Sequence, residues 1–487
     1  MKKLKHKLLL IIALTVIVTT ITGAALVMGD GTTTYKVIAN NDLGMHCACP
    51  TFAGFLLLHP FNTIRAQVIQ YGGDKPILVN SGITVNYSFA EETDAILQAD
   101  PYFASWIANS PKLFPGFQPV VNGKVMGLAG YGLTGTMGYN TTSKSWNAVG
   151  VPVYPVTTGN TAKDIMIDPL GGPNRDPYLT ANITVKNTSG QTIATTTTVV
   201  PVAFGGCCTC HLDLAARNGY PATLAGSFEY LGVLHSRNSS GINIAMIDPD
   251  GDGVGGPVRC SWCHWDPAMG ESAAPGWPAG TQLLPGANFT LKKSVYSFSD
   301  VLHRFHAQDS VVLSQYDANI ARNCYDCHPG NNVNCYRGSH KGKTEIWCTD
   351  CHGDLNQRIA TNQMSQPWQQ STLPTCYAPS PGISSAFSCH SSDTYRTNVT
   401  WDQGLFGKFI NARGHYTSAL LCQTCHGMPH AENPSTQALD NVQNAALQGA
   451  VSGAVYPNGK DGTYALGVCD VCHYQKSTTW SVPPHEQ

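Results

Sequence analysis

Six stretches of this 487-residue chain have the order Cys-x-x-Cys-His, with two thiols three positions apart and a histidine directly after the second. This order is typical of covalent haem attachment, in which the thiols form thioether bonds to the porphyrin and the histidine ligates its iron. Chance would produce about 0.02 copies in a chain of this composition, so the motifs predict six haem c groups. The predicted attachment cysteines are Cys207, Cys210, Cys260, Cys263, Cys324, Cys327, Cys348, Cys351, Cys422, Cys425, Cys469 and Cys472, and the predicted proximal histidines are His211, His264, His328, His352, His426 and His473.

A seventh, stretched motif lies between the fourth and fifth regular ones. Cys376 precedes Cys389 and His390 with twelve residues in between, and these are rich in Ser, Pro and Ala. A looped-out insertion still brings two thiols to one porphyrin. We therefore expect seven haem c groups, with a disulfide between Cys376 and Cys389 as the alternative.

Each haem that transfers electrons in the low-spin state needs a second axial ligand, commonly His or Met. Nine histidines outside the motifs follow the N-terminal segment, which nearly matches the number of irons and favours bis-His ligation. His303 and His306 are spaced i, i+3 on a predicted helix, so they share one face and are placed to serve two neighbouring haems. His59 lies in an apolar run before Pro60 and is expected to be structural. The predicted distal ligands are His46, His235, His303, His306, His340, His415, His430 and His485.

Four cysteines remain: Cys47, Cys49, Cys208 and Cys335. An even number of leftover cysteines in an exported chain predicts disulfides. Cys47 and Cys49 are too close in sequence to pair comfortably, so we expect each to bond elsewhere, with Cys208 as one partner. Such a bond would tie the two halves of the chain together; a thiolate metal site is the alternative.

Three carboxylates, Asp248, Asp250 and Asp252, have the spacing of the start of a calcium loop, and Gly253 stands at the turn position. At the twelfth position of such a loop, Arg259 replaces the usual bidentate Glu. The pattern predicts a calcium site completed by other ligands, with a polar turn as the alternative.

The N-terminus predicts export. Lys2, Lys3, Lys5 and Lys7 precede an apolar run, so residues 1–29 are expected to be a secretory signal peptide. A retained membrane anchor is the alternative. The total of 18 cysteines also indicates an exported protein, extracellular or at the cell surface, with the periplasm as a further location.

The elements that position these residues divide the chain at about residue 203. Residues 30–203 contain β-prone runs at 35–39, 63–71 and 83–89, and a hairpin over 181–202 that turns at 187–190. We predict a mostly β, sandwich-like domain. A helix over 91–107 is expected to break at Pro101, and the Gly- and Pro-rich stretch 121–177 is expected to form long loops.

Residues 204–487 are predicted to form an irregular, loop-rich multihaem cytochrome domain with short helices, the clearest at 299–321 and 436–449. With about 40 residues for each haem, the chain wraps porphyrin faces in place of a large apolar core. The formal net charge of −2 and the lack of a basic cluster exclude nucleic acid as an expected partner.

The six motifs, the stretched motif and the dispersed histidines resemble those of exported prokaryotic multihaem c-type cytochromes. Within that group the chain resembles extracellular electron-transfer cytochromes, some of which polymerise into filaments. The segment Asn-Asp-Leu-Gly-Met-His-Cys at 41–47 is similar to one that precedes the haem region of such proteins. The resemblance is good over 204–487 and weak over 30–203.

This resemblance implies electron relay through closely stacked bis-His haems, with redox proteins or extracellular electron acceptors as partners and no organic substrate. In filament formers a histidine ligates a haem of the next subunit, and His46 and His485 are the positions where we would expect it. A second hypothesis is an enzyme, a multihaem reductase acting on a nitrogen or sulfur oxyanion at the stretched-motif haem. The supply of histidines and the lack of Cys-x-x-Cys-Lys count against it. A third hypothesis is an adhesion or surface-layer subunit whose β domain is the functional part.

Overall fold

The computed structural model describes most of residues 34–264 and short pieces beyond them. The described ranges are 34–42, 45–50, 53–57, 62–71, 77–141, 143–156, 175–239, 241–264, 281–283, 290–292, 297–308, 324–325, 327–329, 399–402 and 405–409, with single residues at 333, 348, 424 and 430.

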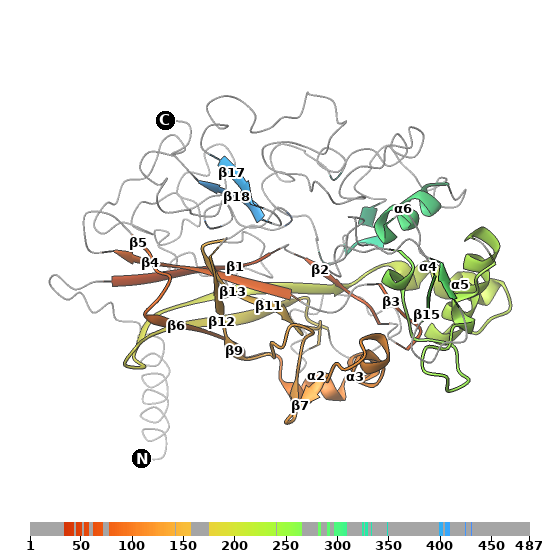
Figure 1. The fold of residues 1–487 in the computed structure, drawn as a ribbon, viewed down its shortest axis with the longest axis horizontal. Helices are drawn as coiled ribbons and strands as arrows, with labels where there is room; N and C mark the ends of the chain where they lie inside the picture. Colours follow the sequence, from red (N-terminus) through yellow and green to blue (C-terminus); the bar gives the residue numbers. More distant parts are fainter. Residues whose placement is uncertain are drawn as a thin grey trace, which may run out of the picture.

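Two five-stranded β-sheets pack face to face in the first half of the chain (Figure 1). The expected β-rich region is therefore confirmed. All strand pairs in the two sheets are antiparallel except that of β2 with β13. One sheet has the order β1 (Thr34–Asn41), β4 (Asn62–Tyr71), β11 (Ser145–Val151), β10 (Gly138–Asn140), with β5 (Ile77–Leu78) also on β4; the other has the order β2 (His46–Ala48), β13 (Thr192–Phe204), β12 (Tyr178–Asn187), β6 (Ile83–Phe89), β9 (Gly135–Thr136).

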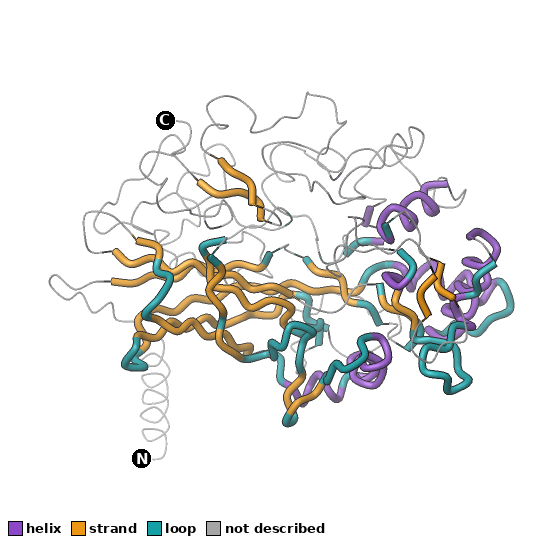
Figure 2. The backbone as a smooth tube through the Cα atoms, in the orientation of Figure 1, coloured by secondary structure: helices purple, strands orange, loops and turns teal. Residues whose placement is uncertain are grey.

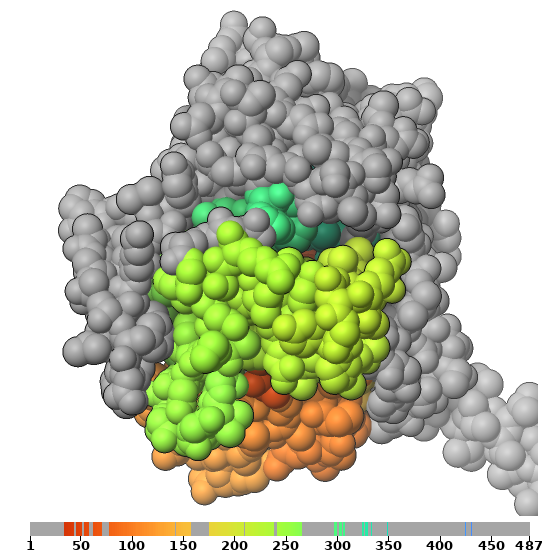
Figure 3. Space-filling model, turned by 90° about the vertical axis from the view of Figure 1, so that its right-hand side faces the viewer, coloured from red at the N-terminus to blue at the C-terminus, as the bar shows by residue number. Residues whose placement is uncertain are grey.

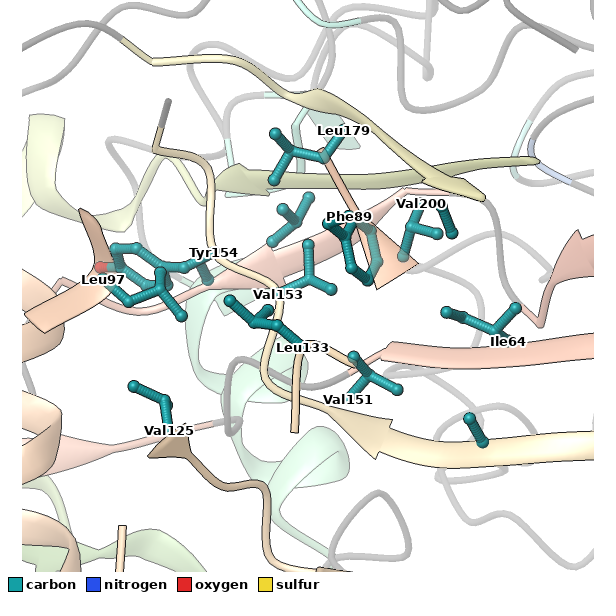
Figure 4. Packing of buried hydrophobic residues seen from close by; sticks show 14 of the residues in the cluster. Ile64, Phe89, Leu97, Val125, Leu133, Val151, Val153, Tyr154, Leu179 and Val200 are labelled. Carbon is teal, nitrogen blue, oxygen red and sulfur yellow. The ribbon is translucent and has the colours of Figure 1, made fainter. Parts of the chain in front are cut away.

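Alternation along the strands builds the core between the sheets. In β6 the side chains of Val85, Tyr87 and Phe89 are buried, while the residues between them are partly exposed, as a strand with one face on a core requires. Figure 4 shows part of this core, with Ile64 and Val200 among the packed side chains. Full burial of one such side chain contributes about 1.5–3 kcal/mol.

The predicted hairpin joins β12 and β13. Its turn is closed by the Asn187 side-chain oxygen, which accepts the backbone N–H groups of Ser189 and Gln191 at 3.0 and 2.9 Å. Gly190 supplies a positive φ of 79°, which favours glycine. The hairpin is therefore confirmed, and β13 runs on to Phe204.

The predicted helix with a break is also confirmed, with shifted bounds: α2 spans Asp94–Ala99 and α3 spans Pro101–Leu113. Asp100 separates them and caps α3, because its Oδ1 accepts the N–H groups of Tyr102 and Phe103 at 3.0 Å. Trp106 on α3 is fully buried, so α3 closes one end of the core.

The expectation of long loops over 121–177 is wrong for its middle part, because β11 lies in a sheet beside β4. Four successive residues of β11, Ser145 to Ala148, are buried, and its register with β4 shifts between Ala148 and Val151. A bulged strand buried on both faces lacks the alternation that marks a strand in sequence. Two smaller strands, β7 (Val120–Val121) and β8 (Lys124–Val125), pair in the same stretch.

The helices after the sheets gather at one end of them (Figures 1 and 2). They are α4 (Cys207–Arg217), α5 (Leu224–Ser239) and α6 (Phe298–Gln308). In the end-on view of Figure 3, the green residues after the sheets pack directly against the orange residues of the first half. The remaining short elements are η1 (Ile244–Met246), η2 (Cys260–Trp262), β3 (Phe55–Leu56), β14 (Val258–Arg259), β15 (Thr281–Leu283), β16 (Thr290–Lys292), β17 (Val399–Asp402) and β18 (Leu405–Phe409).

The helix predicted over 299–321 corresponds to α6 in its first part, and its remainder lies outside the described residues, as does the helix predicted over 436–449. The strands β3 and β14 pair across the predicted division at residue 203. The predicted signal peptide over 1–29 also lies outside the described residues. Within the part of the chain that the structure describes, no helix combines the length and apolarity needed to cross a bilayer.

Candidate haem-ligand cluster

The first haem motif starts directly where β13 ends. Gly205 and Gly206 turn the chain from β13 into α4, and the Gly206 N–H donates to the carbonyl oxygen of Cys327 in the third motif at 2.9 Å. A Cβ on Gly205 would lie 3.2 Å from the same carbonyl oxygen, a closer approach than side chains normally make. The two glycines thus let the backbones of the first and third motifs touch.

Helix α4 places the chemistry of the first motif on one face. Cys207, Cys210 and His211 are spaced i, i+3 and i+4, so all three side chains lie on the same side of the helix. Burial, and secondarily His306, lowers the pKa of His211 to about 4. The ring is therefore neutral at pH 7, the form in which imidazole ligates a metal.

Two distal candidates on α6 have their ring orientation fixed by the helix itself. The Nδ1 atoms of His303 and His306 lie 2.7 Å from the carbonyl oxygens of Ser299 and Leu302, each four residues earlier. A carbonyl oxygen only accepts, so Nδ1 carries the proton and the lone pair of the neutral ring is on Nε2. Both rings are thereby prepared for ligation through Nε2.

These two rings lie opposite two predicted proximal histidines. The ring centre of His306 is 6.3 Å from that of His211, and the ring centre of His303 is 6.2 Å from that of His328. An iron bound on both sides at about 2 Å by imidazole nitrogens places the ring centres about 6.3 Å apart. The buried Nδ1 of His211 has no hydrogen-bond partner among the described residues. The donor sets at both positions, two thiols and two facing imidazoles, fit a haem c.

The thiols of three motifs lie close together. Burial, then the neighbouring Cys327, Cys49 and Cys208, raises the pKa of Cys207 to about 12. A hydrogen bond to the Cys348 thiol, and then burial, raises the pKa of Cys324. The first, third and fourth motifs therefore meet in one place, although Cys348 follows Cys207 by 141 positions along the chain.

The second motif approaches the opposite end of α6. Its first residues form η2, which continues β14. The ring of His264 lies 6.5 Å from that of Phe298, the first residue of α6. Arg259, just before this motif, stacks its guanidinium over the Phe114 ring at 4.7 Å and so ties the motif to the end of α3.

Two other predicted distal ligands, His46 and His235, lie outside α6 and bond different partners. His46 on β2 directs Nε2 to the carboxylate of Asp42 at 2.8 Å. Burial alone would raise the pKa of Asp42, but His46, and after it the charge of Arg65 and a backbone hydrogen bond, together lower it, so the net shift is downward. His235 on α5 has Nδ1 2.9 Å from the carbonyl oxygen of Ile242, the arrangement that favours ligation through Nε2.

Of the remaining predicted site residues, His430 is partly buried and is described without neighbours on either side. The others fall outside the described residues. They are Cys335, Cys351, Cys376, Cys389, Cys422, Cys425, Cys469, Cys472, His340, His352, His390, His415, His426, His473 and His485.

The leftover cysteines lie near the junction of the two halves. Cys47 on β2 is the register partner of Ala203 on β13, and the buried Cys49 follows it toward Phe55, whose carbonyl oxygen lies 3.9 Å from its sulfur. Both residues are thus close to the strand end that leads into Cys208. The disulfide pairing stays a prediction.

The three carboxylates of the predicted calcium loop do converge, with oxygens within 4.8 Å of one another. The ammonium group of Lys112 on α3 contacts two of them, Asp250 at 2.6 Å and Asp252 at 3.0 Å. A lysine thus already balances part of the negative charge that a calcium ion would balance. The calcium site stays a prediction, and Lys112 is a competitor that the local sequence did not reveal.

The sequence analysis did not predict the contacts between the sheets and the later motifs. The Tyr178 hydroxyl donates to the carbonyl oxygen of Val333, which follows the third motif, and the Thr424 hydroxyl, inside the fifth motif, donates to the Gln67 side chain at 2.5 Å. Gln67 within the β-prone run 63–71 was an available signal, because a buried amide needs partners for both of its polar atoms; its nitrogen donates to the Lys144 carbonyl oxygen at 3.0 Å and its oxygen accepts from Thr424.

Comparison with models of protein families, with curated proteins and with solved structures finds no match to this chain.

Proposed function

We propose that the chain is an exported multihaem c-type cytochrome that relays electrons and passes them to redox proteins or to an acceptor outside the cell. The observation that carries the proposal is that two pairs of histidine rings face each other at the spacing of bis-His ligation. The pairs are His211 with His306 and His303 with His328. The six regular motifs and the resemblance to extracellular electron-transfer cytochromes support it.

When bound, each haem supplies a one-electron redox couple at its iron. The role of the chain is to hold and enclose that group. The two cysteine thiols of each motif would hold the porphyrin, and the motif histidine and the distal histidine would ligate its iron. Iron held by two histidines would offer no site for a substrate, so the group would supply electron transfer without bond making.

The resemblance extends the proposal to self-association. His46 and His485 are the histidines proposed to reach a haem of a neighbouring copy, which would continue the relay from one molecule into a filament. Because His46 bonds the Asp42 carboxylate through Nε2, ligation by His46 would use Nδ1, with the carboxylate orienting the ring.

The first test is the haem content and spin state of the secreted holoprotein. We expect a mass corresponding to seven haems, and an electron paramagnetic resonance spectrum of the oxidised protein with low-spin signals alone. The physical reason is that every iron has two strong-field imidazole ligands.

Two results would contradict parts of this proposal. A mass corresponding to six haems would show that Cys376 and Cys389 form a disulfide instead of an attachment site. A stoichiometric high-spin haem would leave an open axial position and would favour the multihaem reductase.

A further inference from the structure

Helix α6 lies among three haem motifs that are far apart in sequence. His306 faces His211 of the first motif, and His303 faces His328 of the third. Because His303 and His306 are three residues apart on one helix, the two groups they serve are about one helical turn, roughly 5 Å, apart along its axis.

We propose that α6 makes the haems of the first and third motifs consecutive members of the relay, and that its two ring pairs give them unequal iron centres. The proposal rests on the proposed electron relay. It assigns an order that the sequence does not suggest, since the second motif separates the two along the chain.

The backbone contacts support this order. The Gly206 N–H donates to the Cys327 carbonyl oxygen, so the two attachment peptides are in direct contact. Cys327 is also the first of the neighbouring thiols that, after burial, raise the pKa of Cys207. The second motif lies at the other end of α6, where the ring of His264 is 6.5 Å from that of Phe298.

The two ring pairs differ in orientation. The planes of His211 and His306 are 84° apart, whereas those of His303 and His328 are 12° apart. Perpendicular imidazoles each interact with a different iron dπ orbital and leave the two orbitals nearly equal in energy. Parallel imidazoles raise the same orbital and split the pair. The first-motif haem is therefore the highly anisotropic low-spin centre of the two, and the third-motif haem is the rhombic one.

The test uses His306→Met and His303→Met in the full-length holoprotein, because methionine remains an axial ligand and keeps the haem six-coordinate. In paramagnetic resonance difference spectra against the wild type, His306→Met should lose one highly anisotropic signal, and His303→Met should lose one rhombic signal. The matched control is His235→Met on α5, which should leave both of these signals in place.

A redox titration followed at the rhombic signal tests the order. Methionine raises the potential of the first-motif haem, so in His306→Met this haem takes up its electron earlier. The added charge then disfavours reduction of its immediate neighbour. We expect the midpoint of the rhombic signal to shift to lower potential, while the signals of distant haems keep theirs.

An unchanged rhombic midpoint, with a shift at another signal instead, would overturn the assignment of the first and third haems as neighbours. If His306→Met lost the rhombic signal and His303→Met lost the highly anisotropic one, the axial pairing on α6 would be overturned. In both cases the wild-type protein would still be fully low-spin, and the relay would stand. High-spin wild-type haem would contradict the relay itself.

Discussion

At the scale of single residues, the candidate ligands are held by bonds to the backbone. His303, His306 and His235 each present Nδ1 to a carbonyl oxygen of the same or the following segment. The ring orientation is therefore set by the helix itself for His303 and His306 and by the segment after α5 for His235, which would lower the entropy lost on ligation.

Glu92 is a buried carboxyl group in the sandwich, and its ionisation bears on the stability of the fold. Its Oε1 accepts the Tyr154 N–H at 3.0 Å, whereas its buried Oε2 has no hydrogen-bond partner among the described residues. Burial, and then the charges of Asp100, Asp94 and Asp176, raises the pKa of Glu92 well above its usual range, against that backbone bond.

We expect Glu92→Gln to stabilise the protein near neutral pH. A raised folded-state pKa means that stability is fully present below the unfolded value of about 4.3 and is lost as pH rises through the folded value. Each unit of raised pKa corresponds to about 1.4 kcal/mol lost. The amide removes this loss and keeps an acceptor for Tyr154, so the gain in unfolding free energy should increase with pH.

Denaturant unfolding of both proteins from pH 4 upward measures this gain. The control is Glu91→Gln, since half-buried Glu91 also accepts a backbone N–H, from Thr180 at 3.0 Å. An equal gain in both variants, or a gain that falls with pH, would show that the ionisation of Glu92 is not the cause.

At the scale of elements, one buried ion pair joins α3 to the segment before β12. Arg175 Nη1 lies 2.5 Å from Asp100 Oδ2, and both side chains are almost fully buried. The guanidinium also lies 5.1 Å from the ring centres of Tyr102 and Phe204. Asp100 caps α3, so this contact fixes the helix start against the end of β13.

Arg175→Met should destabilise the protein by about 3–5 kcal/mol, because it leaves the Asp100 carboxylate buried without its cation. The measurement is the midpoint of chemical unfolding. Arg217→Met on α4 is the matched control: Arg217 pairs with Asp213 at the same 2.5 Å, but both side chains are exposed. It should cost at most about 0.5 kcal/mol. Similar costs for the two variants would contradict the role given to burial.

The helices and strands differ in how well the sequence predicted them. Alternation and turn residues located β6, β12 and β13 closely, and Pro101 located the break between two helices. Strand β11 was missed because its residues are buried without alternation. The ligand motifs are local and are visible in sequence, whereas the pairing of His306 with His211 depends on a contact across 94 intervening residues.

At the scale of the whole molecule, the Cys-x-x-Cys-His motifs pack against a β-sandwich that is built mostly from earlier residues, with Trp262 of the second motif as a motif residue in its core. The core between the sheets consists almost wholly of residues that precede Cys207, and Phe103, Tyr154 and Trp106 seal one end of it. The first, third and fifth motif regions meet this unit through hydrogen bonds at Gly206 and at the buried side chains of Tyr178 and Gln67.

We expect the chain produced without haem attachment to keep the sandwich and to lose order after it. Its circular dichroism should retain the β signal and a cooperative thermal transition, since the core between the sheets consists almost wholly of residues that precede Cys207. Limited proteolysis should leave a fragment ending near residue 205. A featureless thermal scan, or digestion of the whole chain, would show that the haems are needed for the sandwich as well.

All ten strands of the two sheets come before the first attachment cysteine along the chain. A polypeptide that crosses a membrane from its N-terminus therefore delivers the entire sandwich before any Cys-x-x-Cys-His reaches the far side. In the proposed exported cytochrome, each motif would then emerge beside a folded sandwich that is tethered to it through β13. Haem attachment would reach its sites one at a time on a still extended chain, and this order would protect the motif cysteines from mispairing.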